Sequence, residues 1–166
     1  MKGLMIVDNS IILREYHSED CTEIMQLFYD TIHSVNAADY NENQLNAWAP
    51  KLKDNDIAYW DSRFLQDHAV VAEKDGIIVG IGTSKSAGYF DMLYVHKDYQ
   101  RIGVATLIAD RIEKYFRSNG VMTLTTDASI TAKPFFENRG YVVIKEQTVE
   151  TRGQLFTNYK MQKIHN

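Results

Sequence analysis

The sequence predicts an α+β domain (α/β, three-layer) in which one mixed central β-sheet is flanked by helices. Strand-like and helix-like stretches follow one another as β, α, α, β, β, β, α, β, α, β, β, leaving out a short helical piece before Pro50. The chain has 166 residues, 45% of them hydrophobic, which is enough for one core of ordinary size. No internal repeat, linker or low-complexity stretch divides it. Residues 1–166 are therefore interpreted as a single domain.

The first strand and the first helix are predicted at the N-terminal end. Residues 11–16 have the pattern of a strand. Ser18 is a candidate N-cap, with Glu19 and Asp20 in the first helical turn, where acidic groups stabilise the helix dipole. The buried side of this helix is expected to consist of Ile24, Leu27, Phe28, Thr31 and Ile32.

Two further helical segments precede the next strands. A polar loop at 34–43 leads to a short helix around 44–48, which Pro50 ends because proline cannot continue the hydrogen-bond ladder. Residues 57–66 are predicted to be helical. Their apolar side is formed by Ile57, Trp60 and Phe64.

The middle of the chain predicts a hairpin, a third strand and an amphipathic helix. Residues 69–73 and 77–81 are strands joined by a turn at Gly76. Residues 90–95 form the next strand, rich in aromatic and branched side chains. In the helix that follows, the predicted buried face is Val104, Ile108, Ile112, Tyr115 and Phe116, and the predicted polar face is Asp110, Arg111, Glu113, Lys114 and Arg117.

The last third adds one strand, one helix and a closing pair of strands. Residues 122–126 are β-branched and predict a strand. A helix is expected to begin near Thr131, since Pro134 is tolerated only in a first turn. Residues 142–144 and 155–161 then form two strands around a turn.

Composition disfavours several classes of function. The net charge is −4 at pH 7, without a Lys- or Arg-rich run, so the chain has no sign of a nucleic-acid-binding face. No apolar run approaches the roughly 20 residues of a membrane span. The histidines lack metal-ligand spacing, so no metal site is expected. The lone Cys21 fits a reducing compartment, and a cytoplasmic location is expected.

The stretch QRIGVA at 100–105 is the most informative motif. It joins a strand to a helix through a turn that contains Gly103, and a helix beginning there presents unpaired N–H groups and a positive dipole to an anion such as a phosphate. Gly103 allows close approach of the backbone, and Ala105 keeps the next inward position small. An ordinary β–α turn remains the alternative. The Gly-Lys-Ser/Thr ending of triphosphatase loops and the G-x-G-x-x-G pattern of dinucleotide sites are both missing.

Gln100, Gly103 and Ala105 match Q/R-x-x-G-x-G/A, and in this the segment resembles the coenzyme-A signature of the GNAT superfamily of N-acetyltransferases. The preceding LYVHKDY resembles the family's approach to that loop, with Lys97 where proline is common. A second stretch, AKPFFENRGY at 132–141, resembles the family's late helix and following strand. The resemblance covers roughly residues 11–163. It implies a sheet that splays between its fourth and fifth strands to admit the pantetheine arm of the cofactor.

The resemblance also implies a set of cofactor-binding residues for acetyl-CoA (coenzyme A). Leu93, Tyr94 and Val95 would contact pantetheine from the strand. The loop amides would hold the pyrophosphate, and two aromatic side chains of the late helix would line the thiol end. These residues are Gln100, Arg101, Gly103, Val104, Ala105, Phe135 and Phe136.

Asp91 is the candidate general base for a transfer reaction. It lies two residues before Leu93, where relatives resembling this chain place an acid, and apolar neighbours would raise its pKa. The alternative is a carboxylate on the face of the sheet that pairs with an arginine or caps an amide. The family often has a tyrosine that protonates the leaving thiolate, but Phe136 stands at that position. Protonation then falls to water or to another hydroxyl, for which the candidates are Tyr94, Tyr141 and Tyr159.

The resemblance implies an acceptor pocket between the first helices and the last hairpin. Candidate substrate-binding residues in these regions are His33, Tyr40, Trp48 and Asn158. Structural roles remain the alternative for His33 and Trp48. The predicted function is an acetyl-CoA-dependent N-acetyltransferase that acts on a primary amine of a small molecule or peptide by direct attack. A non-catalytic acyl-CoA-binding module is the alternative function. The expected partners exclude nucleic acid and membrane and leave room for a homodimer.

Overall fold

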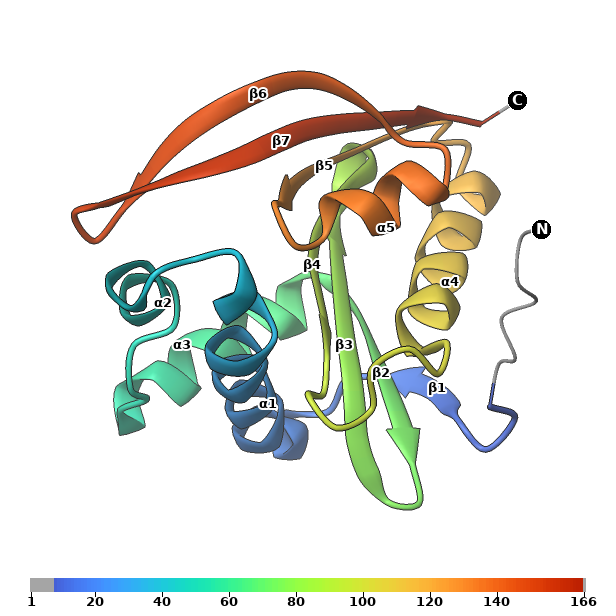
Figure 1. Cartoon of the computed structure of the whole chain (residues 1–166). Coiled ribbons are helices and arrows are strands. Elements are labelled where there is room, and N and C mark those ends of the chain that lie inside the picture. Colours follow the sequence, from blue (N-terminus) through green and yellow to red (C-terminus); the bar gives the residue numbers. More distant parts are fainter. Residues whose placement is uncertain (1–7, 166) are drawn as a thin grey trace.

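The computed structural model describes residues 8–165, and its central feature is a seven-stranded sheet (Figure 1). The strand order is β1-β2-β3-β4-β5-β7-β6. Neighbouring strands are antiparallel except β4 and β5, which are parallel, so the predicted mixed sheet is confirmed. The strands are β1 Ile12–Glu15, β2 His68–Lys74, β3 Ile77–Lys85, β4 Tyr89–Val95, β5 Thr123–Ser129, β6 Val142–Thr151 and β7 Gln154–Ile164.

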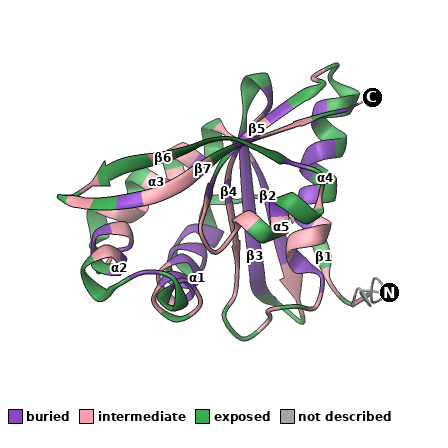
Figure 2. Ribbon diagram, turned by 45° about the horizontal axis from the view of Figure 1, so that its top comes forward, coloured by how far each residue is buried: buried purple, intermediate pink, exposed green. Residues whose placement is uncertain are grey.

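Helices cover both faces of this sheet and enclose two cores. The helices are α1 Cys21–Ser34, α2 Glu42–Trp48, α3 Asp54–Gln66, α4 Val104–Ser118 and α5 Lys133–Asn138. Helices α1, α2 and α3 lie on one side of the sheet, whereas α4 and α5 lie on the other (Figure 1). The first core contains Met25 and Ile81, and the second contains Ile112 and Met161. The central strand β3 is buried along most of its length, whereas the edge strand β6 is exposed (Figure 2).

Two helices begin at residues other than those predicted, for reasons of capping. Ser18 does not cap α1, because residues Ser18–Asp20 form a separate 3-10 turn. There the Asp20 carboxylate accepts a hydrogen bond from the His17 N–H at 2.9 Å. Helix α3 begins at Asp54 rather than at residue 57, and the Asp56 carboxylate accepts a hydrogen bond from the Lys53 N–H at 2.8 Å.

Helix α4 corrects two assignments made from periodicity. Glu113 was expected on the polar face but is buried, with Arg139 Nε at 2.7 Å and Lys163 Nζ at 2.6 Å from its carboxylate oxygens. Two cations therefore compensate its charge. Tyr115 was expected in the core but is 42% exposed, and its ring stacks on His68 with centroids 3.9 Å apart.

Strands β6 and β7 extend beyond β5 as a long hairpin that reaches over α2 (Figure 1). The predicted strands were shorter, because neither segment has a consistently buried side to reveal its length. Two hydrogen bonds attach the hairpin to α2. The Arg152 guanidinium donates to the Ala47 carbonyl at 2.6 Å, and Gln44 Nε2 donates to the Leu155 carbonyl at 2.9 Å.

The sheet separates between β4 and β5, as the resemblance implied. The two strands pair only at Tyr89 with Thr125 and at Phe90 with Thr126. An irregularity in the β3–β4 register falls at the same level, where Thr83 pairs with Met92 and the next residue of β3 pairs with Phe90. Asp91 is the residue passed over, so it lies on a β-bulge at the point of separation.

Candidate functional site

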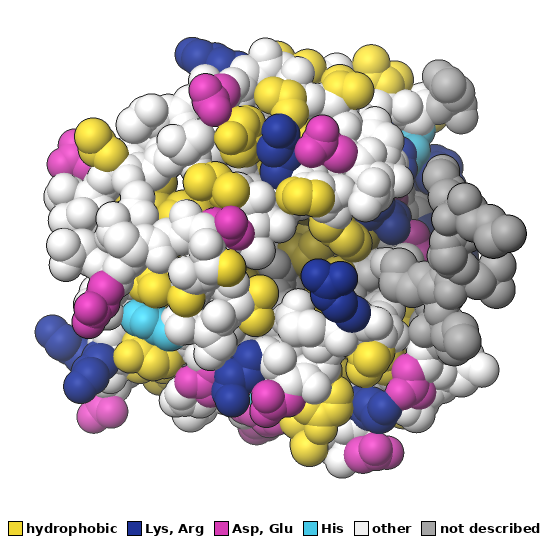
Figure 3. Space-filling model, viewed as in Figure 1, with side chains coloured by type: hydrophobic (Ala, Val, Ile, Leu, Met, Phe, Trp, Pro, Cys, Tyr) yellow, Lys and Arg dark blue, Asp and Glu magenta, His cyan; other side chains and the backbone are white. Residues whose placement is uncertain are grey.

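A cleft of about 970 Å³ opens where β4 and β5 separate. Its walls come from β4, β5, the start of α4, α5, the region of α1 and α2, and the β6–β7 hairpin. The surface is hollowed between the hairpin and the helices below it, and hydrophobic side chains are visible inside (Figure 3). All ten residues predicted to bind the cofactor line this cleft: Leu93, Tyr94, Val95, Gln100, Arg101, Gly103, Val104, Ala105, Phe135 and Phe136.

The loop before α4 has the backbone expected of an anion site. Gly103 is the N-cap of α4 and has φ 95°, in the left-handed region that glycine tolerates best. The helix begins its hydrogen-bond ladder with Leu107 N–H donating to the Gly103 carbonyl at 3.0 Å. The N–H groups of Val104 and Ala105 precede that bond, so they belong to the positive end of the helix dipole.

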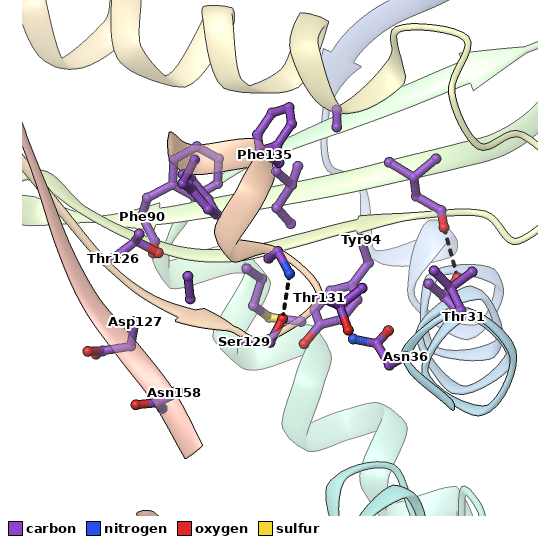
Figure 4. A pocket seen from close by; sticks show the side chains of 18 of the residues that line it. Thr31, Asn36, Phe90, Tyr94, Thr126, Asp127, Ser129, Thr131, Phe135 and Asn158 are labelled. Carbon is purple, nitrogen blue, oxygen red and sulfur yellow. Dashed lines mark hydrogen bonds between the residues drawn. The ribbon is translucent and has the colours of Figure 1, made fainter. Parts of the chain in front are cut away.

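Gln100 supports the loop through its side chain. Its Nε2 donates to the Val95 carbonyl at 2.7 Å and to the His96 carbonyl at 3.3 Å. Thr31 of α1 donates its hydroxyl proton to the same Val95 carbonyl at 2.9 Å (Figure 4). The end of β4 is thus fixed from two sides. Thr31 was missed as a site residue because its place in the apolar pattern of α1 predicted only burial.

Asp91 lines the cleft and is also paired with an arginine, which was the alternative reading of this residue. Its Oδ2 lies 3.1 Å from Nη2 of Arg63 on α3, and its side chain is 17% exposed. Burial raises the pKa of the Asp91 carboxyl above its ordinary value, and the charge of Arg63 offsets part of that rise. Sequence analysis missed Arg63 as a site residue. It lies on a predicted helix, and no sequence motif connects it with Asp91.

Among the three tyrosines considered as proton donors, only Tyr94 lines the cleft within the part of the chain that the structure describes. Burial raises the pKa of its hydroxyl, which therefore keeps its proton at neutral pH. Tyr141 is 2% exposed and packs against Phe136 in the core. Phe136 itself is 3% exposed and meets Phe90 edge to face at 5.5 Å, so it closes the cleft from the core side.

The other end of the cleft is aromatic, with polar groups at its margin. Tyr40, Trp48 and Phe156 contact one another, with centroids 5.2 Å apart for Tyr40–Trp48 and 6.1 Å for Trp48–Phe156. Asn158 projects from β7 near Asp127 of β5 (Figure 4). Its Oδ1 is buried and has no hydrogen-bond partner among residues 8–165. A buried acceptor of this kind suits a ligand N–H group.

His33, which was predicted to bind the substrate, is held by contacts outside the cleft. Among the described residues it is absent from the lining of the cleft, because its ring is engaged elsewhere. Its Nε2 lies 2.7 Å from the Ala49 carbonyl, and the ring packs against Tyr29 at 4.2 Å. Cys21 is also remote from the lining within that range; its thiol faces the Ile57 carbonyl at 3.5 Å, and burial raises its pKa.

Two other features are missing from residues 8–165, namely a cluster of metal-binding side chains and a membrane-spanning helix. No three or more His, Cys, Asp or Glu side chains in this range gather in a way that would hold a metal ion. None of the helices in this range has the length and apolar character required to span a bilayer.

Comparison with known proteins gives consistent matches. A family model described as the acetyltransferase (GNAT) domain matches residues 36–163. The uncharacterized N-acetyltransferase YafP of Escherichia coli K12 is 35% identical over 153 residues, which cover 92% of this chain and 95% of YafP.

Solved structures match over nearly the whole chain. A GCN5-related N-acetyltransferase from Rhodopseudomonas palustris, also described as a class-II aminotransferase, has a TM-score of 0.90 and 35% identity, and the match covers 98% of this chain and 99% of that chain. YncA, a putative acetyltransferase from Salmonella typhimurium, was solved with its cofactor acetyl-CoA. It has a TM-score of 0.68 and 17% identity and covers 94% of each chain, which supports the fold.

Proposed function

The chain belongs to the GNAT acetyltransferase family and is thereby an acyltransferase, and from this premise we propose that it transfers an acetyl group from acetyl-CoA to a primary amine. The acceptor is a small molecule or a peptide. The observation that carries this proposal is the continuous cleft at the separation of β4 and β5. The loop before α4 lies at one end of the cleft, and an aromatic pocket lies at the other end.

The cofactor is assigned to the end of the cleft beside α4. Its diphosphate lies against the N–H groups at the start of the helix, where the dipole and the left-handed Gly103 favour an anion. Its pantetheine arm lies along residues 93–95, which β5 leaves unpaired. Phe135 and Phe136 of α5 shield the thiol end from water.

The thioester supplies an activated acetyl group, and the chain supplies groups that move protons. Asp91 accepts a proton from the ammonium form of the acceptor, which frees the nitrogen lone pair for attack on the carbonyl carbon. As the C–S bond breaks, Tyr94 donates its hydroxyl proton to the departing sulfur. The resulting phenolate then takes the second proton that the nitrogen must lose to become the neutral amide, and Asp91 returns its proton to water. A burial-raised pKa suits both residues, because Asp91 becomes a stronger base and Tyr94 keeps its proton until it is needed.

Tyr40, Trp48 and Asn158 are assigned to the acceptor. The aromatic side chains give an apolar wall for the carbon skeleton, and the unpartnered Asn158 Oδ1 accepts a hydrogen bond from the substrate. Release of CoA thiol from acetyl-CoA across a panel of simple amines, polyamines, aminoglycosides and peptides tests the transfer. Silence across this panel would contradict it and would favour a cofactor-binding module.

Replacing Asp91 by Asn tests the base. Because the carboxylate is active only when ionised, activity of the native enzyme should fall as the pH falls through the raised pKa of Asp91. Asp91→Asn should lower kcat about 10²–10⁴-fold and remove that acidic limb, as is typical for the loss of a general base. The measurement is kcat/KM against pH with the most reactive amine of the panel. An unaltered profile would remove Asp91 from this role.

A further inference from the structure

The partner of Asp91 comes from a helix on the acceptor side of the sheet. Arg63 lies in the last turn of α3, and its Nη2 is 3.1 Å from Asp91 Oδ2. Both side chains are partly screened from water, with exposed fractions of 30% for Arg63 and 17% for Asp91. Asp91 lines the cleft, whereas Arg63 is outside the lining that residues 8–165 form. The guanidinium therefore approaches the carboxylate from the protein rather than from the cleft.

Aromatic rings restrict the guanidinium of Arg63. Its central carbon lies 4.9 Å from the centroid of Trp60 and 5.9 Å from that of Tyr59, both on the same helix. Such cation–π contacts reduce the number of rotamers that a long side chain samples. On the strand side, the β-bulge turns Asp91 out of the regular alternation toward α3. The helix and the bulge thus fix the two partners independently of each other.

We infer that Arg63 is a positioning residue for acetyl transfer, holding Asp91 by its Oδ2 so that Oδ1 faces the acceptor amine. This inference rests on the proposed role of Asp91 as the base. Arg63 has no contact with substrate in this scheme and acts only through the carboxylate. An uncharged side chain of similar size at position 63 would leave Asp91 protonated over a wider range of pH.

The other charges around Asp91 act in both directions. Burial raises the pKa of Asp91 most strongly; Arg63 and then Lys85 lower it, whereas the carboxylates of Asp67 and Asp127 raise it. Tyr89 packs nearby with its hydroxyl donated to Asp127 at 2.8 Å, and Tyr94 is uncharged. Arg63 is the largest of the influences that keep the carboxyl ionised, so its removal should raise the pKa further.

The test compares full-length Arg63→Met and Arg63→Lys with the native protein. Titration of the ¹³C-labelled Asp carboxyl carbons by NMR, with the Asp91 signal assigned through Asp91→Asn, follows ionisation without any acceptor. In Arg63→Met the Asp91 signal should titrate at higher pH, because one nearby opposite charge is lost. The acidic limb of kcat/KM should move to higher pH with it, so that at a pH on this limb kcat/KM is about tenfold lower than in the native protein, after each is scaled to its plateau. Arg63→Lys should restore the limb in part, because it keeps the charge without the planar fork.

Arg14→Met is the matched control. It also removes a guanidinium that pairs with carboxylates, here Asp20 at 2.7 Å and Glu73 at 2.8 Å, but it touches neither Asp91 nor the cleft. Arg14→Met should leave the pH at which the acidic limb occurs unchanged. If Arg63→Met lowers the rate equally at every pH and the Asp91 signal does not move, the inference is overturned while the base remains. If Asp91→Asn keeps the limb, the base itself is overturned and the inference falls with it.

Discussion

Gly103 shows how one residue shapes the cofactor end of the cleft. Its φ of 95° lets the chain turn sharply into α4, and its lack of a side chain leaves the helix N-terminus open. A carboxylate at this position would stand where the diphosphate is assigned. Like charges placed side by side at an interface cost several kcal/mol, which corresponds to an affinity loss of about 100-fold or more.

Gly103→Glu is therefore expected to abolish measurable binding of acetyl-CoA in calorimetry. Gly120→Glu is the matched control, because Gly120 also has a positive φ (75°) and its Cβ would meet nothing within 4 Å. Both variants carry the same kind of backbone strain and the same added charge. Only the first should lose the cofactor, and unchanged affinity in Gly103→Glu would contradict the assignment of the loop.

At this scale the sequence predicted residues that do line the cleft beside α4. Gly103 acts through the backbone, and the Gln100 side chain bonds to carbonyls only four and five residues away, so neither depends on distant partners. The sequence could not predict the Arg63–Asp91 pair, whose members are 28 residues apart on different elements. It also assigned His33 to the substrate. A histidine at a helix end gives the same pattern whether it faces a pocket or, as found, the Ala49 carbonyl.

Among the elements, β3 and α4 pack unusually closely because β3 carries two glycines. A Cβ on Gly82 would lie 2.3 Å from Ile108 Cγ2 and 3.0 Å from Ile112 Cδ1. A Cβ on Gly80 would lie 2.6 Å from Val104 Cγ1. This packing brings the first turn of α4 against the sheet, and with it the loop that is assigned to the diphosphate.

Gly82→Ala should destabilise the fold by about 1–3 kcal/mol, the usual cost of overpacking a core. Urea denaturation gives this value directly. Ile108→Ala removes the atom in conflict, so the double variant should lose less stability than the sum of the single variants. Additive losses would show that α4 does not press on β3 at this point.

Most elements were predictable because their hydrophobic residues follow the period of a strand or of a helix. The residues that were predicted wrongly have local causes. The α4 stripe of Val104, Ile108, Ile112 and Phe116 is confirmed, since each is buried. Glu113 is buried as well, because Arg139 and Lys163 compensate its charge. Both lie outside α4, so the periodicity of that helix could not reveal them. Helix α3 begins earlier than predicted because the Lys53 N–H donates to the Asp56 carboxylate at the start of the helix. The polar residues there resembled a loop.

For the molecule as a whole, the β4–β5 separation links cofactor binding to stability. Acetyl-CoA bound between the two halves of the sheet would stabilise only the folded state. At a concentration 100 times its Kd the gain is about 2.7 kcal/mol, which raises Tm by about 5–10 °C for a domain of this size. Thermal unfolding with and without acetyl-CoA measures the shift. Gly103→Glu should show none, and a native protein that fails to respond would contradict the proposed cofactor site.

The fold class, the order of elements and the splay of the sheet were predicted from the sequence and the resemblance. The resemblance placed the last hairpin near the first helices, but the hydrogen bonds that attach the β6–β7 hairpin to α2 were not predicted. These bonds depend on Arg152 and Gln44, each of which bonds to a main-chain carbonyl on a distant segment. Hydrogen bonds to carbonyls leave no complementary residue in the sequence, so pattern analysis cannot detect them. The cytoplasmic location and the homodimer stay predictions.

Because β4 and β5 pair at only two positions, part of the sheet is open to an added hydrogen-bonding partner. Each strand continues past Phe90 and Thr126 with main-chain groups that its neighbour does not satisfy. An extended molecule with amides of its own, as pantetheine is, can occupy that vacancy like an eighth strand. If acetyl-CoA binds there as proposed, its pantetheine arm would extend the sheet while it is bound, and each turnover would add and then remove that part of the sheet.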